Sequence, residues 1–375
     1  MTFDQHLAAA RGTFRQWLGA IPDGGRVVVF CHFDADGLGA GAVFGRGLPR
    51  LGIEDVAVVS SGRHESAFSD EARERLAVLR PDALLVTDLG VNDGGTLEEI
   101  GAPVLYVDHH RPNGQPAEAS VVSGYDWDPI PCSAWLAHSL LADAASEGGV
   151  DVSDLDWIAA VGVISDLGEK APWPPMADVK KRFTAKWLKE AVALVNAARR
   201  APTFDAETAL DALMTYDDPK TLATAEDAAA DRLRAARQTV KDETAEARKA
   251  APVFSERDAA VPDGVAPEGL RFALVRIDSP AQVHPLIAQQ WRGRLPKYPV
   301  ICANTGYVDG VVAFSTRAAS RAVRLPEIFQ SIDTPGWNGK WGHGHDQASG
   351  GHLPTDVFND VLDALGFGPE ARVPA

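Results

Sequence analysis

The sequence predicts an α/β fold with an N-terminal doubly wound, mainly parallel sheet, a helical connector and a smaller C-terminal α/β domain. Three observations support this prediction. Short β-rich apolar runs alternate with segments of helical periodicity early in the chain, an Ala-rich charged stretch without glycine covers 204–250, and a second β-rich unit follows. The 375 residues leave room for about two domains. We expect a first domain over 1–200, a helical connector and linker over 201–268, and a second domain over 269–375.

The first segment has the pattern of an amphipathic helix. Apolar side chains recur at helical spacing, at Phe3, Leu7, Phe14 and Leu18. Thr2 suits the N-cap position because its hydroxyl can accept a backbone N–H of the first turn, and Pro22 cannot continue a helix. We therefore expect one helix between these two residues.

Four apolar runs in the first domain predict strands, at 27–32, 56–60, 83–88 and 104–108. Near-continuous apolar runs are typical of strands that are buried on both faces of a sheet. The segments 38–48 and 66–79 are Ala-rich or amphipathic and long enough to be crossover helices. Further helices are predicted at 133–145, with Ser133 as N-cap, and at 155–164, with Asp154 as N-cap.

The pattern changes after Ala171. A Pro-rich loop precedes the segment 180–200, which predicts one helix with a basic start, and 204–250 suits long connecting helices. Pro and Gly become frequent at 251–269, which indicates a linker. The second domain is then predicted to contain three strands and a final helix, at 272–277, 300–303, 308–315 and 356–365.

The chain carries an excess of acid. Lys and Arg number 36, and Asp and Glu number 52, which gives a formal net charge of −16. Because phosphate binding relies on Lys and Arg, this charge excludes a generally basic nucleic-acid coat and works against anionic membranes. Cys31, Cys132 and Cys302 are too few for a disulfide framework, and neither a leader nor a membrane-spanning run is recognisable. We expect a cytoplasmic protein without membrane contact.

Carboxylates and imidazoles follow the predicted strands. His32, Asp34 and Asp36 come after the first strand, and later elements are followed by Asp88, by Asp108, His109 and His110, and by Asp166. The carboxyl ends of parallel strands meet at one edge of a sheet, so we expect these groups to gather there. Clustered carboxylates repel one another and are normally stabilised by cations. Oxygen ligands mixed with imidazole suit manganese or magnesium, and the absence of nearby paired cysteines argues against zinc.

Such a cluster predicts phosphoester hydrolysis. Two ions about 3.5–4 Å apart can generate hydroxide and brace the attacking and leaving oxygens of a phosphoryl transfer. The alternative at each position is structural, because a single Asp after a strand is commonly an N-cap or turn residue. The placement of acids after successive elements favours the metal site.

Four motifs of the first domain occur in the order HFDADG, LLVTDLG, VLYVDHHRP and AAVGVISDLG. In residue type and order they resemble the motifs of the DHH phosphoesterase superfamily, in its RecJ-like branch. Near the C-terminus, GHGHDQASG is similar to the Gly-His loop of the DHH-associated domain, with His343 in place of the middle glycine. VVAFSTRA resembles the strand of that domain that ends in Ser-x-Arg. The resemblance therefore spans both predicted domains.

The resemblance implies a role for each matching residue. Asp88 would bridge two metal ions, with His32 a ligand or a supporting residue and the remaining ligands Asp34, Asp36, His109 and Asp166. Asp108 would orient its neighbours, and His110 would contact the phosphate and stabilise or protonate the leaving group. Arg317 and His345 would complete the catalytic set, and the substrate would be held by Ser315, Arg317, Gly344, His345 and Gly350. Two manganese ions, with magnesium as the alternative, would lie in a cleft between the domains.

Other features admit two interpretations each. Four glycines follow the first strand, at Gly37, Gly39, Gly41 and Gly45. They lack the spacing and the ribose-binding acid of a dinucleotide site, so we interpret them as packing residues. His64 would either reach the same edge or be solvated, and Trp337 and Trp341 are either packing residues or a surface for base stacking. The basic segment 170–189 is either a solvated helix face or a patch that guides a nucleic-acid strand.

Three functions stay open at this point. The first is a nuclease for single-stranded DNA or short RNA. The second is a phosphatase or phosphodiesterase for small nucleotides, such as 3′-phosphoadenosine phosphate or a linear or cyclic dinucleotide, and the acid excess favours it. The third is a nucleotide-binding protein without catalysis, which the intact ligand set argues against. The expected partner is a single-stranded nucleic acid, a short oligonucleotide or a nucleotide, and a homo-oligomer is compatible with the sequence.

Overall fold

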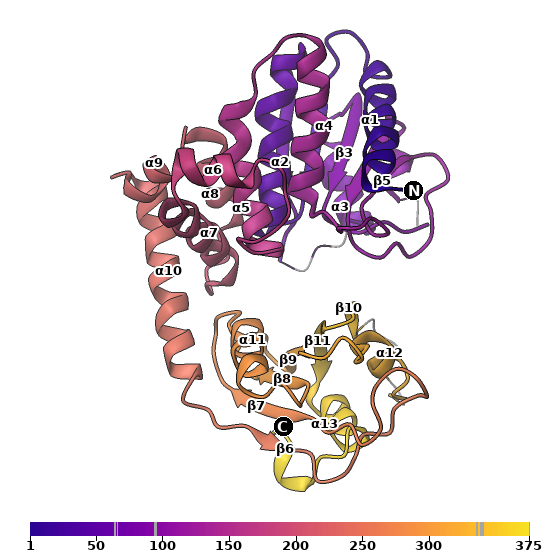
Figure 1. Cartoon of the computed structure of the whole chain (residues 1–375), viewed down its shortest axis with the longest axis vertical. Coiled ribbons are helices and arrows are strands. Elements are labelled where there is room, and N and C mark those ends of the chain that lie inside the picture. Colours follow the sequence, from indigo (N-terminus) through magenta and orange to yellow (C-terminus); the bar gives the residue numbers. More distant parts are fainter. Residues whose placement is uncertain (64, 66, 94–95, 335–336, 338–340, 375) are drawn as a thin grey trace. The chain divides into compact units, whose positions relative to one another are not determined.

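The computed structural model describes residues 1–63, 65, 67–93, 96–334, 337 and 341–374. The chain forms two compact units, which Figure 1 draws with the chain coloured from indigo to yellow. Unit 1 comprises Met1–Arg199 and Thr203–Arg237, and unit 2 comprises Arg200–Pro202 and Gln238–Ala375. In the part of the chain that the structure describes, no helix has both the length and the apolar character needed to cross a bilayer.

Unit 1 contains a five-stranded, fully parallel sheet in the order β2-β1-β3-β4-β5. Its strands are β1 (Val27–Cys31), β2 (Val56–Ser60), β3 (Ala83–Thr87), β4 (Val104–Asp108) and β5 (Ser120–Ser123). The four predicted strands are confirmed to within one residue. Sequence patterning does not reveal β5, because it is short and only one of its residues is buried.

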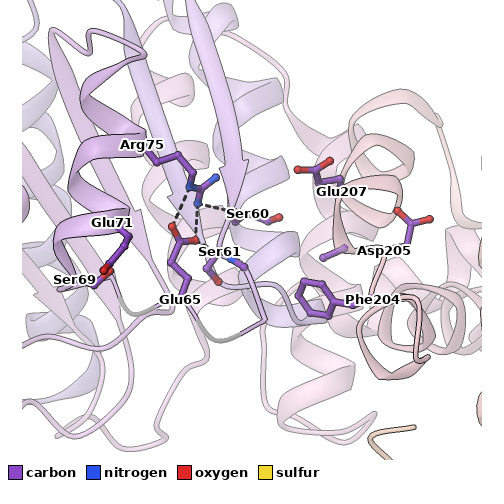
Figure 2. A pocket seen from close by; sticks show the side chains of 11 residues that line it. Ser60, Ser61, Glu65, Ser69, Glu71, Arg75, Phe204, Asp205 and Glu207 are labelled. Atoms are coloured by element: carbon purple, nitrogen blue, oxygen red, sulfur yellow. Dashed lines mark hydrogen bonds and ion pairs between the residues drawn. The ribbon is translucent and has the colours of Figure 1, made fainter. Parts of the chain in front are cut away.

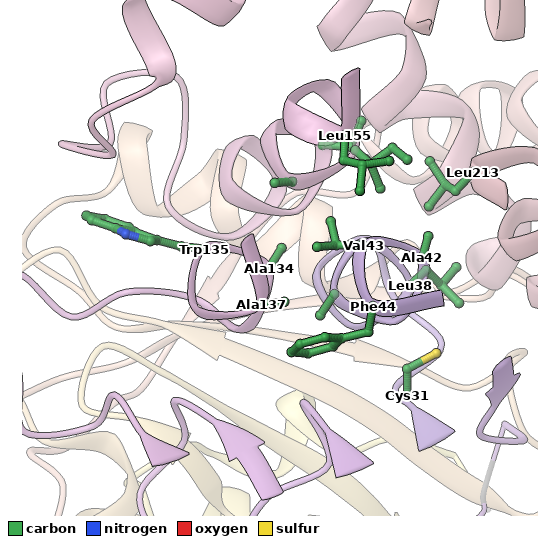
Figure 3. Close-up of a cluster of buried hydrophobic side chains, with 14 of the residues drawn as sticks. Cys31, Leu38, Ala42, Val43, Phe44, Ala134, Trp135, Ala137, Leu155 and Leu213 are labelled. Atoms are coloured by element: carbon green, nitrogen blue, oxygen red, sulfur yellow. The ribbon is translucent and has the colours of Figure 1, made fainter. Parts of the chain in front are cut away.

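Helices cover both faces of this sheet. The side chains of β1 alternate between the two faces, so each face contributes to a separate hydrophobic core. Val27, Val29 and Cys31 join the larger core, whereas Val28 and Phe30 join the smaller one beside α3. Figure 3 shows α2 within the larger core, where Val43 and Phe44 lie among side chains of several elements. The helices are α1 (Phe3–Gly19), α2 (Ala35–Gly47), α3 (Asp70–Ala77), α4 (Ser133–Glu147) and α5 (Asp156–Asp166).

Three short 3-10 turns accompany these helices, η1 (Leu48–Leu51), η2 (Thr96–Ile100) and η3 (Ser153–Leu155), and a further one, η4 (Pro369–Ala371), belongs to unit 2. The predicted N-terminal helix is confirmed as α1. The Thr2 side chain accepts the backbone N–H of Gln5, and the Gln5 side chain accepts the backbone N–H of Thr2. This reciprocal capping box satisfies two donors that would otherwise lack partners within the helix.

Two predicted helix caps are wrong. The N-cap of α4 is Cys132, and the carboxylate of Asp36 accepts the first two helical N–H groups, from Ser133 at 2.8 Å and Ala134 at 2.9 Å. A carboxylate from a distant segment therefore takes the role predicted for Ser133. The N-cap of α5 is Leu155. Asp154 instead pairs with Arg50, and this bidentate ion pair accounts for its position in η3.

The glycines around α2 are packing residues, as predicted. A Cβ added at Gly41 would lie 2.7 Å from Cys31 Sγ, and one at Gly45 would lie 2.4 Å from a Val58 methyl group. Gly162 of α5 is similarly tight, since its added Cβ would lie 2.4 Å from the Ala134 Cβ and 2.8 Å from Asp36 Oδ1. The missing side chains let three helices and two strands approach closely, directly behind Asp36.

We expect Gly162→Ala to lower the free energy of unfolding by about 1–3 kcal/mol, because the new methyl group overpacks the contact with Ala134. Gly12→Ala is the matched control. Gly12 lies in α1 with nothing within 4 Å of an added Cβ, so the helix propensity of alanine should stabilise the protein by about 0.5–1 kcal/mol. Urea unfolding followed by circular dichroism measures both changes. Equal effects of the same sign would contradict this interpretation of Gly162.

The remaining helices of the first part are α6 (Met176–Phe183), α7 (Ala185–Arg200), α8 (Ala206–Thr215), α9 (Pro219–Thr224) and α10 (Ala228–Ala247). The single helix predicted over 180–200 is wrong, because the chain breaks at Thr184, where φ is +60°. The break lets α6 bury Met176 and Val179 while α7 buries Leu188 and its apolar face in another direction. Periodicity within one segment does not reveal such a change of direction.

Unit 2 contains a six-stranded mixed sheet in the order β10-β11-β9-β8-β7-β6, in which only β7 and β8 pair in parallel. Its strands are β6 (Val253–Phe254), β7 (Ala273–Ile277), β8 (Val300–Asn304), β9 (Val311–Arg317), β10 (His343–His345) and β11 (Ala348–Pro354). Its further helices are α11 (His284–Arg294), α12 (Leu325–Gln330) and α13 (Thr355–Ala364).

The three predicted strands and the final helix of this unit are confirmed with shifts of one to three residues. The segment predicted as a Gly-His loop is instead the hairpin of β10 and β11. Its glycines and small residues have low β propensity, but β11 pairs with β9 along its whole length. Pairing with a neighbouring strand therefore decides its conformation.

Candidate metal centre

The fold brings the predicted acids and imidazoles of unit 1 to one edge of the parallel sheet. They come from the ends of β1, β3 and β4, from the start of α2 and from the end of α5: His32, Asp34, Asp36, Asp88, Asp108, His109, His110 and Asp166. Donor atoms of these residues form three groups in which all atoms lie within 4.8 Å of one another, and Asp88 belongs to two of them.

The first donor group contains His32, Asp34 and Asp88. Nδ1 of His32 lies 3.4 Å from Asp34 Oδ1 and 3.5 Å from Asp88 Oδ2. This nitrogen is buried and has no hydrogen-bond partner among the described residues. Asp34 Oδ1 also accepts the backbone N–H groups of Asp36 and Gly37 at 3.1 Å, which fixes its carboxylate at the start of α2.

The second donor group contains Asp36, His109 and Asp166, with Asp88 beside them. Nε2 of His109 lies 3.5 Å from Asp88 Oδ1, 3.8 Å from Asp36 Oδ2 and 4.0 Å from Asp166 Oδ2. Asp36 and His109 are each only 3% exposed. Three carboxylates therefore face one buried imidazole nitrogen.

Asp88 is shared because its two carboxylate oxygens point in different directions. Oδ2 faces His32, whereas Oδ1 faces His109 and accepts the hydroxyl of Ser133 at 2.9 Å. The backbone of Asp88 is left-handed, with φ at +65°. Asp tolerates this region better than most residues, but it remains an unfavourable conformation that the surroundings must hold in place. Ser133, which sequence reasoning assigned only to a helix cap, thus positions the shared carboxylate.

Asp108 and His110 form a connected pair beside Asp88. Asp108 is 1% exposed and accepts the backbone N–H of Gly90 at 2.8 Å and that of His110 at 2.6 Å. Its Oδ1 also lies 3.1 Å from Nδ1 of His110, whose side chain is 41% exposed. The buried carboxylate therefore fixes an imidazole that still reaches solvent. Nδ1 of His110 lies 3.9 Å from Asp88 Oδ1.

Crowding shifts the pKa values of these groups in opposite directions. Burial disfavours charge on His32 and His109, but the facing carboxylates outweigh it and raise the pKa of each imidazole to about 10. Burial also disfavours charge on Asp34 and Asp88, but the nearby imidazoles lower the pKa of Asp34 to about 2 and hold the pKa of Asp88 well below its ordinary range.

Asp36 and Asp166 shift the other way. Burial, reinforced by Asp88, raises the pKa of Asp36 well above its ordinary value, and burial raises the pKa of Asp166 as well. The carboxylates thus outnumber the positive charges within reach, and protons stabilise the cluster where no cation is bound. Such an arrangement is suited to divalent cations.

The predicted residues of unit 2 lie on neighbouring strands of its sheet. Ser315 and Arg317 belong to β9, and Gly350 of β11 pairs with Ser315. Arg317 donates to Ser315 Oγ at 2.8 Å and to the Thr316 carbonyl at 3.0 Å, and it forms no ion pair with a carboxylate of the described residues. Burial, with a smaller contribution from Arg292, lowers the pKa of Arg317 to about 10.

Gly344 and His345 lie on β10, where His345 is exposed. A Cβ at Gly344 would lie 2.2 Å from the Ala348 carbonyl oxygen, and one at Gly350 would lie 2.3 Å from the Phe314 carbonyl oxygen. Only glycine fits at these close backbone contacts. The hairpin and β9 therefore form one surface that contains an arginine without a carboxylate partner among the described residues.

The structure assigns other contacts to most of the features that admitted two interpretations in the sequence. Trp341 packs against Phe314 and Phe329, and Trp337 joins the same core cluster, which favours the packing interpretation. Two of the six basic residues at 170–189 form ion pairs within unit 1, because Arg182 pairs with Asp156 and Asp178 and Lys189 pairs with Glu169. His64 lies outside the described residues. The three cysteines are buried and free.

Comparison with known proteins finds a family match within unit 1. Residues 26–168 match the N-terminal domain of the DHH family. The single-stranded-DNA-specific exonuclease RecJ of Thermus thermophilus is 31% identical over 167 residues, which cover 41% of this chain and 24% of that protein. The chain thus spans about a quarter of this curated relative's length.

Two solved structures share the fold along nearly the whole chain. RecJ from Thermus thermophilus in complex with Mn²⁺ has a TM-score of 0.65 at 21% identity, covering 97% of this chain and 55% of that chain. A crystal structure of exonuclease RecJ bound to manganese has a TM-score of 0.63 at 23% identity, covering 97% of this chain and 95% of that chain. Residues 26–168, where the four motifs occur in order, are therefore similar to the N-terminal domain of the DHH family and to RecJ in sequence, and the two units together share the fold of the RecJ structures.

Proposed function

We propose that the protein is a divalent-metal-dependent phosphoesterase that hydrolyses phosphodiester bonds of single-stranded DNA or short oligonucleotides. The observation that carries this proposal is the position of Asp88, whose two carboxylate oxygens each lie 3.5 Å from a different imidazole. A carboxylate shared in this way suits a pair of ions. The similarity to RecJ supports the choice of substrate.

The residues present fit two divalent cations. We infer that the first donor group, with His32, Asp34 and Asp88, holds one ion and that the second holds the other through Asp36, Asp88, His109 and Asp166. Carboxylate oxygens mixed with imidazoles suit Mn²⁺, with Mg²⁺ as the alternative, and Nδ1 of His32 faces the carboxylates of Asp34 and Asp88, where it would become a ligand after losing its proton. Bound cations of this kind lower the pKa of water and stabilise the charge of phosphoryl transfer.

The chain's own residues supply binding and proton transfer. Burial opposes charge on His110, but Asp108 and Asp88 raise the pKa of His110 to about 8, so at neutral pH it carries a proton that it can donate to a leaving oxygen. Arg317 offers a planar guanidinium for a phosphate. We assign Ser315, Gly344, His345 and Gly350 to the same substrate-binding surface. The cytoplasmic location and a homo-oligomeric state stay predictions from the sequence.

A second candidate function is hydrolysis of small nucleotides, favoured by the net charge of −16. A substrate panel separates the two. We would incubate the full chain and Mn²⁺ with 5′-labelled single-stranded DNA, very short RNA, cyclic dinucleotides and 3′-phosphoadenosine phosphate. Comparable rates on long and short strands support the exonuclease, and activity confined to the shortest species supports the second candidate. Tight binding without any hydrolysis would contradict both.

Metal binding is expected to release protons. At pH 7 the metal-free His32 and His109 are protonated, because the pKa of each is about 10, whereas a metal binds only the neutral imidazole. Below that pKa, the logarithm of the Mn²⁺ association constant should therefore rise by about one to two for each pH unit. Calorimetric titrations at pH 7 in two buffers of different ionisation enthalpy measure the number of protons released.

Two variants, each with one histidine replaced, test this prediction and serve as its control. His109→Gln is expected to reduce the number of released protons by about one. His6→Gln, which changes a residue stacked on Trp127 away from the cluster, should leave that number unchanged. A Mn²⁺ affinity that stays constant between about pH 6.5 and 8.5 would overturn the assignment of the two imidazoles.

A further inference from the structure

A cavity of about 720 Å³ opens in unit 1 next to the metal centre. It lies between the end of β2, the start of α3 and the segment that leads into α8 (Figure 2). Its volume is within the range of pockets that hold small organic ligands. The lining residues that matter here are Ser61, Glu65, Glu71, Arg75, Phe204 and Glu207. The roles proposed above for metal and phosphate binding use none of them.

Phe33 contacts both a residue that lines this cavity and a residue of the metal centre. The ring of Phe204 meets that of Phe33 edge-on, with centroids 5.2 Å apart, and the Phe33 ring lies 4.2 Å from the ring of His32. The backbone N–H of Ser61 donates to the carbonyl of Cys31, the residue before His32. The lining of the cavity is therefore connected to His32 of the metal centre by two successive ring contacts and by one backbone hydrogen bond beside it.

The cavity contains an aromatic surface that the backbone holds in an unfavourable conformation. Phe204 is left-handed, with φ at +45°, which is rare for a bulky residue. Its ring is half-buried, and Figure 2 shows it facing Ser61 across the cavity. The guanidinium of Arg63 lies 5.0 Å from the ring centroid. Unfavourable backbone conformations of this kind concentrate at ligand-binding sites, and an aromatic face is a surface on which a base stacks.

The polar lining favours a neutral ligand with N–H and O–H groups over a phosphate. The hydroxyl of Ser61, a residue only 2% exposed, has no hydrogen-bond partner among the described residues. Glu65 neutralises Arg75 through two contacts, at 2.7 and 2.9 Å. Glu71 and Glu207 form no ion pair within the described part of the chain. These carboxylates repel phosphate but accept hydrogen bonds from a base or a ribose.

We propose that this cavity binds the nucleoside part, base and sugar, of the nucleotide whose phosphate is hydrolysed at the metal centre. The proposal rests on the function proposed above, and it deepens that function by assigning a specificity-determining subsite. Phe204 stacks on the base, the hydroxyl of Ser61 pairs with a polar group of the nucleoside, and Glu71 and Glu207 accept its N–H or O–H groups.

Uncharged nucleosides test the cavity without any need for hydrolysis. We would titrate the Mn²⁺-loaded full chain with adenosine, guanosine, cytidine and uridine by calorimetry. At least one nucleoside should bind, and Phe204→Ala should weaken that binding about tenfold or more. Glu207→Gln, at an exposed position, should weaken it several-fold. Phe254→Ala, at an exposed phenylalanine of β6, is the matched control and should change nothing.

A second measurement uses two dinucleotides that differ only by removal of one base. The wild type should hydrolyse the intact dinucleotide at least about tenfold more efficiently, in kcat/KM, and Phe204→Ala should remove this preference. Equal rates on both, or no binding of any nucleoside, would overturn the proposal. If neither dinucleotide is hydrolysed, the proposed function fails, and the nucleoside titration still decides whether the cavity is a nucleoside site.

Discussion

Asp88→Asn is expected to lower kcat for metal-dependent phosphodiester hydrolysis by at least about 1000-fold, which corresponds to ~4 kcal/mol of transition-state stabilisation. The reason is geometric, since Asp88 is the only described residue whose carboxylate belongs to both the His32 group and the His109–His110 group. Loss of its charge weakens both inferred metal sites at once. Asn is the informative replacement because it tolerates the left-handed backbone at φ +65° and can still accept the Ser133 hydroxyl.

The measurement is hydrolysis of a short labelled oligonucleotide with Mn²⁺, together with Mn²⁺ binding by calorimetry. Asp217→Asn is the matched control, because its side chain is 93% exposed and its rate should match the wild type. Circular dichroism should show that both variants are folded. Turnover of Asp88→Asn within tenfold of the wild type would contradict the assignment of Asp88.

Arg317→Lys is expected to lower kcat/KM for the same substrate by about 100-fold, or ~2.7 kcal/mol, mainly through a higher KM. Arg317 is half-buried, its guanidinium is held by Ser315 Oγ and the Thr316 carbonyl, and no described carboxylate neutralises it. A half-buried cation without an acidic partner is suited to an anionic ligand. Lysine keeps the charge but loses the planar pair of donors that matches two phosphate oxygens.

Arg276→Lys provides the control for this substitution. Arg276 lies on β7 in the same sheet but donates to the backbone carbonyls of Glu370 and Arg372, so its replacement should leave KM unchanged. Steady-state kinetics that separate KM from kcat decide the outcome. If Arg317→Lys stays within threefold of the wild type in both constants, Arg317 does not bind the phosphate.

Part of the excess of acidic residues is concentrated at one place in the structure. The net charge of −16 includes Asp34, Asp36, Asp88 and Asp166, which meet at one edge of the unit 1 sheet. There the carboxylates shift the pKa values of the imidazoles and of one another, as a site suited to cations should. Other acids, such as Asp231 and Glu246 of α10, pair with surface arginine and lysine.

The sequence by itself determined the main elements of unit 1 and the residues of the candidate site. Buried parallel strands require continuous apolar runs, and the apolar runs at 27–32 and 83–88 are bounded by polar residues. Short motifs at the strand ends then indicate the edge at which the acids gather, because parallel topology makes their carboxyl ends coincide. This is local information, and it is available without a structure.

The tertiary structure alone decided which atoms meet at that edge. The Asp36 carboxylate caps α4 across 97 residues of sequence, and the Ser133 hydroxyl reaches Asp88 across 45. Phe204 approaches Phe33 from the segment before α8, and the Gly-His segment becomes a hairpin because β9 lies beside it. No local pattern encodes such contacts, since each depends on the packing of segments that are distant in the chain and adjacent only after folding.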